Sequence, residues 1–393
     1  MERADVVVIG AGLIGSAIAW RLAQAGRRVV LLDRGEPGSE ASWAGAGLLQ
    51  PEAGREASPE TLRLWLESLA MYDEFVREVR EATRATFEYR VSGRLVLALD
   101  EAQEETLRTR AQAQVDAGIP YEWLSGDDVR RMEPSITPDV RAALYYRQHG
   151  LVDNRGLSRA LALAAAIAGA EVRPYEPAIE IAVSGDRVGG VETPNGRIAA
   201  DVVVNAAGCW SGLLAPTRAV IAQQDKGKTV GPDHQRSSAS SIPGDLIVRP
   251  AKGEIIALEA RPRPIDRVIT IPGGSISARA DGRIVVGATI IHGSFRKEIT
   301  ADGVAKMLTA ATRAIPSLRD ARFLEAWTGL RPHSLDDQPI IGPDRIAGLY
   351  WATGHFTMGI LSTPATADVV ASVIEGRPPR VPINSMSPRR FER

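Results

Sequence analysis

The sequence predicts a mixed α/β fold in which a helix-covered parallel sheet is interleaved with a mostly antiparallel sheet. The first 33 residues alternate strand, glycine turn, helix and strand. Strand patterns broken by Pro and Gly dominate residues 246–289, and a long apolar helix comes last, over 360–375. N-terminal, central and C-terminal segments would therefore share the first sheet. The expected ranges are 1–85, 145–215 and 325–380 for the first domain, 86–144 and 216–324 for the second, and 381–393 for a loose tail.

Local patterns define the remaining elements. Asp5–Ile9 and Arg28–Asp33 are β-rich runs on either side of a glycine turn and a helix over 16–25. Turn residues predict hairpins about Ser92-Gly93 and Pro194-Asn195-Gly196, and Gln223–Ser241 is polar enough to be a mobile surface loop. Helical spacing predicts further helices over 61–83, 101–117, 157–168 and 300–315.

Composition excludes several classes of protein. The net charge of −1 over 393 residues gives no general electrostatic grip on nucleic acid or on an anionic membrane. No stretch reads as a membrane span or a signal peptide, and the histidines lack metal-ligand spacing, so no metal is expected. Cys209 is the single cysteine, which suits a reducing cytoplasm and predicts a small buried residue. The oligomeric state is left open, and a homo-oligomer is compatible with these features.

A glycine-rich turn gives the first functional signal. Gly10, Gly12 and Gly15 form GxGxxG directly after a strand and at the start of a helix, the context of a dinucleotide-binding Rossmann-like turn. The helix N-terminus would meet a pyrophosphate. Asp33 ends the next strand and can accept hydrogen bonds from a ribose diol, which favours FAD or NAD over NADP. The alternative is a compact turn with no ligand.

Two later segments favour FAD over NAD. The apolar strand over 201–208 ends in small residues, so its backbone can pass close beneath a nucleotide, although it also reads as a plain core strand. Gly354–Leu361 places a glycine-flanked turn before the last helix, whose N-terminus can face an anionic reduced flavin. Helix capping alone would explain that turn equally well.

With these segments in view, the sequence resembles the D-amino-acid oxidase superfamily, and within it the glycine oxidase branch. The resemblance extends over residues 4–376 in seven ordered pieces. It implies a glutathione-reductase-like FAD domain beside a mostly antiparallel substrate domain. The matching pieces are VVVIGAGLIGSAIAWRLA, ASWAGAGLL, NAAGCWSG, VRPAKGE, GRIVVGAT, GLRPHSLDDQPIIGP and ATGHFTMGIL.

The resemblance implies noncovalently held FAD. The substrate's α-hydrogen would pass as hydride to flavin N5, the imine would be hydrolysed, and O2 would be reduced to peroxide. No catalytic residue is then required, and a backbone contact from His355 is favoured over proton transfer. The implied cofactor contacts are Gly10, Gly12, Leu13, Ile14, Gly15, Asp33, Arg34, Ala41, Ser42, Ala46, Gly47, Leu48, Ala178, Ala207, Gly208, Trp210, Gly354, His355, Phe356, Thr357, Met358, Gly359, Ile360 and Leu361.

The same resemblance assigns the substrate pocket. Arg331 matches the arginine that pairs with the substrate carboxylate; the alternative is a structural ion pair with Asp336 or Asp337. The other pocket positions depart from glycine oxidases: Thr357 replaces a second arginine, Ser275 a tyrosine and Ile290 a methionine. A larger, secondary or N-substituted amine is therefore compatible with the pocket.

The function expected is FAD-dependent oxidative deamination of a small amino acid or amine. The alternatives are an FAD dehydrogenase that passes electrons to a quinone or carrier, a flavin-binding relative without turnover, and a plain NAD dehydrogenase. The resemblance allows a role either in supplying an imino acid for the thiazole part of thiamine or in amino-acid catabolism.

Overall fold

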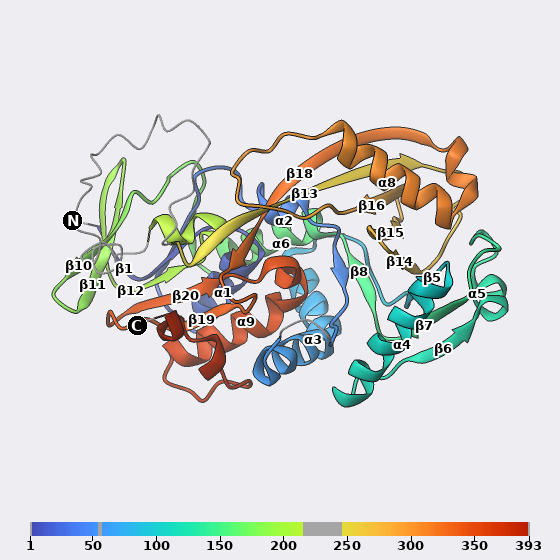
Figure 1. The fold of residues 1–393 in the computed structure, drawn as a ribbon. Coiled ribbons are helices and arrows are strands. Elements are labelled where there is room, and N and C mark those ends of the chain that lie inside the picture. Colours follow the sequence, from blue (N-terminus) through green and yellow to red (C-terminus); the bar gives the residue numbers. More distant parts are fainter. Residues whose placement is uncertain (1, 54–56, 215–245, 392–393) are drawn as a thin grey trace, which may run out of the picture.

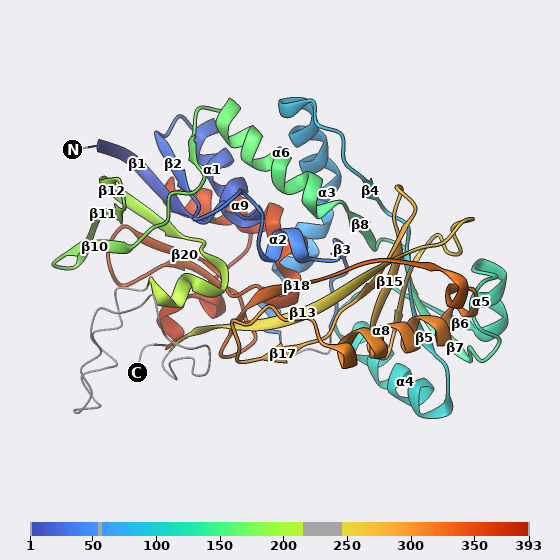
Figure 2. The same ribbon diagram turned by 90° about the horizontal axis from the view of Figure 1, so that it is seen from above.

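The computed structural model describes residues 2–53, 57–214 and 246–391. Figures 1 and 2 show two halves side by side, each built around its own sheet, with strands β13 and β18 running from one half to the other. The N-terminal strand and the C-terminal segment lie in the same half. The chain therefore passes back and forth between the halves, as the interleaved plan predicts.

The first half contains an eight-stranded sheet. Strands β1, β2, β9, β12 and β20 are parallel, and β10, β11 and β19 join them in antiparallel pairs. Val6 of β1 pairs with both Val202 and Val29, so strands far apart in the chain are neighbours. The bounds are β1 Glu2–Ile9, β2 Val29–Leu32, β9 Glu171–Arg173, β10 Glu180–Ser184, β11 Arg187–Thr193, β12 Gly196–Asn205, β19 Ile340–Pro343 and β20 Leu349–Thr353.

Four helices pack in the core beside this sheet. Val6, Val8 and Leu31 share one cluster with fully buried residues of all four helices. Local signals start them: Ser58 caps the longest, its Oγ accepting a hydrogen bond from the Thr61 amide at 3.1 Å. The bounds are α1 Leu13–Gln24, α3 Pro59–Thr83, α6 Asn154–Ile167 and α9 Gly359–Ile374.

The second half contains a nine-stranded sheet in which only β5 and β14 pair in parallel. Strand β13 pairs along its whole length with β18, from Val248 opposite Ser334 to Glu259 opposite Arg322. The sheet is therefore mostly antiparallel, as predicted. Its strands are β5 Arg94–Ala98, β6 Glu122–Ser125, β7 Ala142–Tyr146, β13 Val248–Glu259, β14 Val268–Ile271, β15 Gly274–Ala278, β16 Arg283–Gly287, β17 Ile291–His292 and β18 Arg322–Ser334.

Smaller elements complete the fold. Asp100 and Thr300 cap two helices of the second half, as their side chains accept from the amides of Gln103 and Gly303. A three-stranded sheet joins segments of the two halves. These elements are α2 Ala41–Ala44, α4 Glu101–Asp116, α5 Gly126–Met132, α8 Ala301–Ala314, the small-sheet strands β3 Leu48–Leu49, β4 Tyr89–Arg90 and β8 Gly150–Val152, and the short 3-10 helices η1 Gly208–Leu213, η2 Pro316–Asp320, η3 Phe356–Met358, η4 Asn384–Met386 and η5 Pro388–Phe391.

Two local predictions are wrong. Ser92-Gly93 does not turn a hairpin, because β4 pairs with β8 whereas β5 pairs with β7 and β14; the dipeptide instead carries the chain from one sheet to another. The C-terminal segment is no loose tail over the residues described. Met386 is fully buried, and Arg390 pairs with Asp336 at 2.7 Å.

The remaining local predictions concern a hairpin, the domain boundaries, one polar segment and the last helix. The hairpin at Pro194-Asn195 is confirmed, since Thr193 pairs with Gly196. The domain boundaries remain a prediction, and the one at residue 325 falls within β18. The polar segment Gln223–Ser241 lies outside the described residues. Among those described, one helical stretch, Phe356–Ile374, is long and apolar enough to cross a membrane; it is 67% buried and packs against α1 and α3 as a core helix.

Candidate functional site

A cavity of about 1010 Å3 extends between the two halves. Its lining comes from the glycine turn, the loop around α2, the end of β12, the turn before α9, and the face of the nine-stranded sheet. All the predicted site residues line it except Gly354 and Leu361. Gly354 lies beside Ser334 and Ile340, and Leu361 is buried in the core of the first half.

The glycine turn has the geometry that a pyrophosphate requires. Gly10 has φ +100°, a left-handed conformation that favours glycine. A Cβ on Gly15 would lie 1.9 Å from the Gly10 carbonyl oxygen, so only glycine lets α1 pack this close to the turn. At Gly12 the nearest atom to such a Cβ is the Ser42 Oγ at 3.0 Å. The backbone of Gly12 therefore faces the cavity, where the first turn of α1 directs amides that have no acceptor within the helix.

Asp33 closes one side of this turn. Its Oδ2 accepts from the Ala11 amide at 2.7 Å and its Oδ1 from the Gly35 amide at 2.9 Å. Burial raises the pKa of the Asp33 carboxyl, opposed by these two amides. Both oxygens retain acceptor capacity toward the cavity, as ribose binding requires. Next to it, Arg34 stacks on the Trp210 ring at 3.6 Å.

The loop over 41–48 is held in place from both halves. The Ser42 Oγ accepts from the Leu13 amide at 3.0 Å, and Asn154 donates to the Ser42 carbonyl at 2.6 Å. Trp327 of β18 donates to the Ala44 carbonyl at 3.0 Å. Buried Arg279 donates to the Ala46 carbonyl. The loop is therefore a rigid wall between the nucleotide turn and the second sheet.

The turn before α9 forms the opposite wall. His355 is buried, and its Nε2 makes a 3.1 Å hydrogen bond with the Thr366 hydroxyl. Burial lowers the pKa of His355 to about 4, so the ring is neutral near pH 7. Phe356 has φ 49°, and the helix begins at Gly359. The N-terminal end of α9 thereby faces the cavity.

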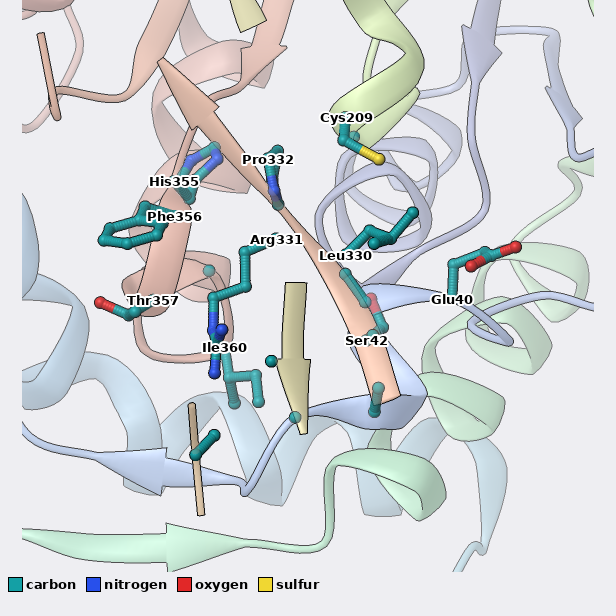
Figure 3. A pocket seen from close by; sticks show the side chains of 18 of the residues that line it. Glu40, Ser42, Cys209, Leu330, Arg331, Pro332, His355, Phe356, Thr357 and Ile360 are labelled. Atoms are coloured by element: carbon teal, nitrogen blue, oxygen red, sulfur yellow. The ribbon is translucent and has the colours of Figure 1, made fainter. Parts of the chain in front are cut away.

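Arg331 extends from β18 into the cavity, and Figure 3 shows its side chain ending near Thr357 and Ile360 in that view. Its guanidinium lies over Gly253, where a Cβ would meet it at 2.2 Å, and donates to the Thr289 carbonyl at 3.1 Å. The two acids of the alternative ion pair have other partners: Asp336 pairs with Arg390, and Asp337 makes a hydrogen bond with the His333 Nε2.

The other pocket positions differ in burial. Ser275 is buried, and its Oγ lies 3.0 Å from the Thr270 Oγ1. Ile290 is 47% exposed at the cavity edge. Cys209 is fully buried, which raises the pKa of its thiol. It is therefore a small core residue, as predicted. Among the described residues, no group of His, Cys, Asp or Glu could hold a metal ion.

Two polar groups in the cavity lining are missing from the sequence prediction. Glu254 is fully buried and joins Lys252, Thr289 and Thr300 by hydrogen bonds. Arg94, 1% exposed, lies with Arg110 and Glu52. The available signals were the Lys-Gly-Glu motif and a charged residue opening the apolar run Arg94–Ala98. Neither reveals which distant partners the fold brings to it.

These features fit a bound FAD. The cavity reaches from a glycine turn and a carboxylate suited to the adenosine diphosphate to the start of α9, suited to the flavin ring. Gly10 and Gly15 of the turn are required by close backbone approaches, which a side chain at either position would prevent. The predicted contacts thus lie along one continuous surface.

Comparison with known proteins gives the same result. A family described as FAD dependent oxidoreductase matches residues 5–373. A glycine oxidase from Geobacillus kaustophilus is 32% identical, over 95% of this chain and 93% of that protein. The crystal structure of glycine oxidase from the same species has a TM-score of 0.87 at 29% identity, covering 98% of each chain. The structure of iminodiacetate oxidase from Chelativorans sp. BNC1 has a TM-score of 0.81 at 28% identity, covering 98% of each. The chain belongs to the family of FAD-dependent oxidoreductases, and FAD is its cofactor.

Proposed function

We propose that this protein is an amino-acid or amine oxidase that deaminates a small carboxylated amine and reduces O2 to peroxide. The observation that carries the proposal is the position of Arg331, a cation in the cavity that also contains the glycine turn and the start of α9. A guanidinium there can bind a carboxylate bidentately and remains charged when buried. The similarity to a glycine oxidase and to an iminodiacetate oxidase supports an amino-acid substrate.

The residues of this chain would act mainly by binding and orientation. Arg331, held by the Thr289 carbonyl and lying over Gly253, would fix the carboxylate and so the direction of the Cα–H bond. The bound FAD would supply the redox chemistry, as acceptor of the substrate's hydride and as electron donor to O2. The loop over 41–48 and the turn before α9 would exclude bulk water from that exchange.

His355 would not transfer a proton in this reaction. The ring is buried, bonded to Thr366 and neutral near pH 7, so it serves to hold the turn in place. The amine would therefore lose its proton before or during binding, without a dedicated base. Rate should rise with pH as the free amine becomes populated.

The residues of the pocket favour one class of substrate over glycine. Ser275 and Thr357 are small and polar, and a chain with these residues has room for a substituent on the substrate nitrogen or α-carbon. Glycine itself would fill this pocket poorly. A secondary or N-substituted amino acid is the class that this pocket favours, in cytoplasmic catabolism or cofactor synthesis.

The test is a peroxide-coupled screen of glycine, sarcosine, iminodiacetate and D-amino acids, followed by stopped-flow reoxidation of the reduced protein. We expect at least one secondary amino acid to give stoichiometric peroxide, with fast reoxidation by O2. Reduction by a substrate without fast reoxidation would replace the oxidase by a dehydrogenase that uses a quinone or carrier. No reduction by any amine would refute the proposal.

A further inference from the structure

Besides Arg331 and Arg34, two further arginines line the cavity. Arg94 begins β5 and is 1% exposed, whereas Arg110 lies on α4. The Arg94 Nε donates to the Thr270 Oγ1 at 2.8 Å, and its Nη1 lies 3.5 Å from the Glu52 carboxylate. Arg110 also pairs with Glu52. We call Arg94, Arg110 and Glu52 the second arginine cluster.

The register of the nine-stranded sheet places this cluster on the same face as Arg331. The side chains of directly paired residues on neighbouring strands point to the same side of the sheet. One line of such pairs crosses the sheet from β18 to β5 through Trp327, Ile255, Gly287, Ser275, Thr270 and Val96. Side chains two or four residues along a strand share that side. Arg331 follows Trp327 by four and Arg94 precedes Val96 by two. Both guanidinium groups therefore belong to the face that lines the cavity.

Hydrogen bonds connect the cluster to the substrate pocket. Thr270, which accepts from Arg94, lies 3.0 Å from Ser275, Oγ1 to Oγ. Ser275 pairs with Gly287, two residues before the Thr289 carbonyl that holds Arg331. The Arg331 guanidinium lies over Gly253 of β13, and Arg94 bonds Thr270 of β14, so the two sites are three strands apart, about 14 Å across the sheet at the ordinary strand spacing.

The cluster has an excess of positive charge. Burial lowers the pKa of Arg94 to about 10, which still leaves it protonated near pH 7. Glu52 is one carboxylate for two guanidinium groups. Burial and the two arginines hold the pKa of His149 far below its usual range, so the ring adds no charge. The Arg94 side chain is buried, whereas the Arg110 side chain is 29% exposed and is therefore partly solvated. A buried cation that shares its only carboxylate with a second cation gains from an added anion.

The cavity also contains an unpaired hydrogen-bond acceptor, which suits a donor such as water or the substrate nitrogen and does not itself bind a carboxylate. The Oε1 of Gln50 is buried and has no hydrogen-bond partner among the described residues. Gln50 lines the cavity, as do Glu52, Arg94 and Arg110. A buried polar atom of this kind normally bonds to something, here to water or to a ligand.

From this arrangement we infer that the substrate carries a second carboxylate, which binds at Arg94 and Arg110 while the α-carboxylate binds at Arg331. The substrate class is a dicarboxylic amino acid, with the second acid on the nitrogen substituent or on the side chain. The inference rests on the proposed function, because it takes Arg331 as the site of the first carboxylate.

The first experiment compares carbon-matched acids on the FAD-loaded protein. Glutarate and pentanoate have equal chain lengths and differ in one carboxylate, as do adipate and hexanoate. Binding would be followed by the change in the flavin absorption spectrum. We expect each diacid to bind about tenfold or more tightly than its partner, since a charge-assisted bond to a buried guanidinium adds to the first. Equal dissociation constants would overturn the inference.

Variants then assign the effect to the cluster. Arg94→Met and Arg110→Met should each bring the ratio of the two dissociation constants toward one. The charge-balanced pair Arg94→Met with Glu52→Gln should do the same, and it serves if the single change at Arg94 prevents folding. Arg108→Met is the matched control, because Arg108 is on the same helix with its side chain 55% exposed. A ratio that persists without Arg94 and Arg110 would refute the assignment.

Anaerobic reduction identifies where the second acid sits. Iminodiacetate would be compared with sarcosine, and D-glutamate with D-glutamine. Faster reduction by iminodiacetate places the acid on nitrogen, and faster reduction by D-glutamate places it on the side chain. If neither acidic amine is favoured, the inference fails while the oxidase proposal survives. If no carboxylate of either kind perturbs the flavin, the proposed function fails as well.

Discussion

Replacing Glu254 by glutamine should weaken both the fold and the substrate site. The Glu254 carboxylate accepts from the Thr300 amide at 2.8 Å, the Thr300 hydroxyl at 3.0 Å, the Thr289 hydroxyl at 3.1 Å and the Lys252 ammonium at 3.1 Å. These bonds hold the pKa of Glu254 below its usual range against the effect of burial. Glutamine keeps some of the hydrogen bonds but leaves Lys252, whose side chain is 7% exposed, without its counter-charge.

The size of the effect follows from that burial. Removing one partner of a buried ion pair costs about 3–5 kcal/mol, and the retained amide puts this change at about 3 kcal/mol of unfolding free energy. Thr289 links Glu254 to Arg331, because its hydroxyl bonds the carboxylate and its carbonyl accepts from the guanidinium. A displaced carbonyl should raise the dissociation constant for a carboxylate by about three- to tenfold, with FAD affinity unchanged.

Two assays separate these effects. Thermal unfolding of the FAD-loaded protein should show a Tm lower by about 5–10 °C, and spectral titration with pentanoate should show the weaker binding. Glu298→Gln is the matched control, since the Glu298 side chain is 69% exposed and pairs only loosely with Arg296. A Glu254→Gln protein with unchanged Tm would contradict the reasoning about the buried pair. A lower Tm with unchanged pentanoate binding would break the link through Thr289.

Three further predictions follow from the same geometry. Gly12→Ala should weaken FAD binding with little change in the Tm of the FAD-free protein. Gly15→Ala should weaken FAD binding and also lower that Tm, because its Cβ would overlap the Gly10 carbonyl. Equal losses of Tm in the two variants would contradict the different roles of these glycines. Arg331→Met should raise KM for a carboxylated substrate tenfold or more while FAD stays bound, and an unchanged KM would remove Arg331 from the pocket. His355 has a pKa of about 4 in the folded protein, below the value of about 6.5 in the unfolded chain. Its contribution to the free energy of unfolding is therefore complete above pH 6.5. About 3 kcal/mol of that free energy is lost as the pH falls to 4. Urea unfolding of His355→Gln at a series of pH values should show a shallower loss across that window than the parent protein.

The nucleotide half was largely predictable because its signals are local. Gly10, Gly12 and Gly15 sit between two β-rich runs, and each of the expected helices appears within a few residues of its predicted bounds. Helix caps such as Ser58 lie beside the segments they start. Patterns of this kind depend on neighbours in the chain, which the sequence displays directly.

The second arginine cluster could not be predicted for the opposite reason. Arg94 meets Glu52 and Thr270 only after three separate segments have folded together. The wrong hairpin at Ser92-Gly93 has the same origin: the dipeptide suits a turn, but the strands on either side find partners in different sheets. Likewise, the basic C-terminal residues predict a free tail, because the sequence alone does not show that the fold places Asp336 beside Arg390.

The wide separation of neighbouring strands has a consequence for biosynthesis. On one side β1 borders β2, which follows it closely, but its other neighbour, β12, emerges from the ribosome only after residue 196, and α9 is completed only at residue 374. The apolar first helix, α1, therefore stays incompletely covered by its packing partners until α9 has been synthesised. FAD capture should be a late event that follows the synthesis of α9, and a nascent chain stalled before α9 should be a substrate for chaperones rather than a partial flavoprotein.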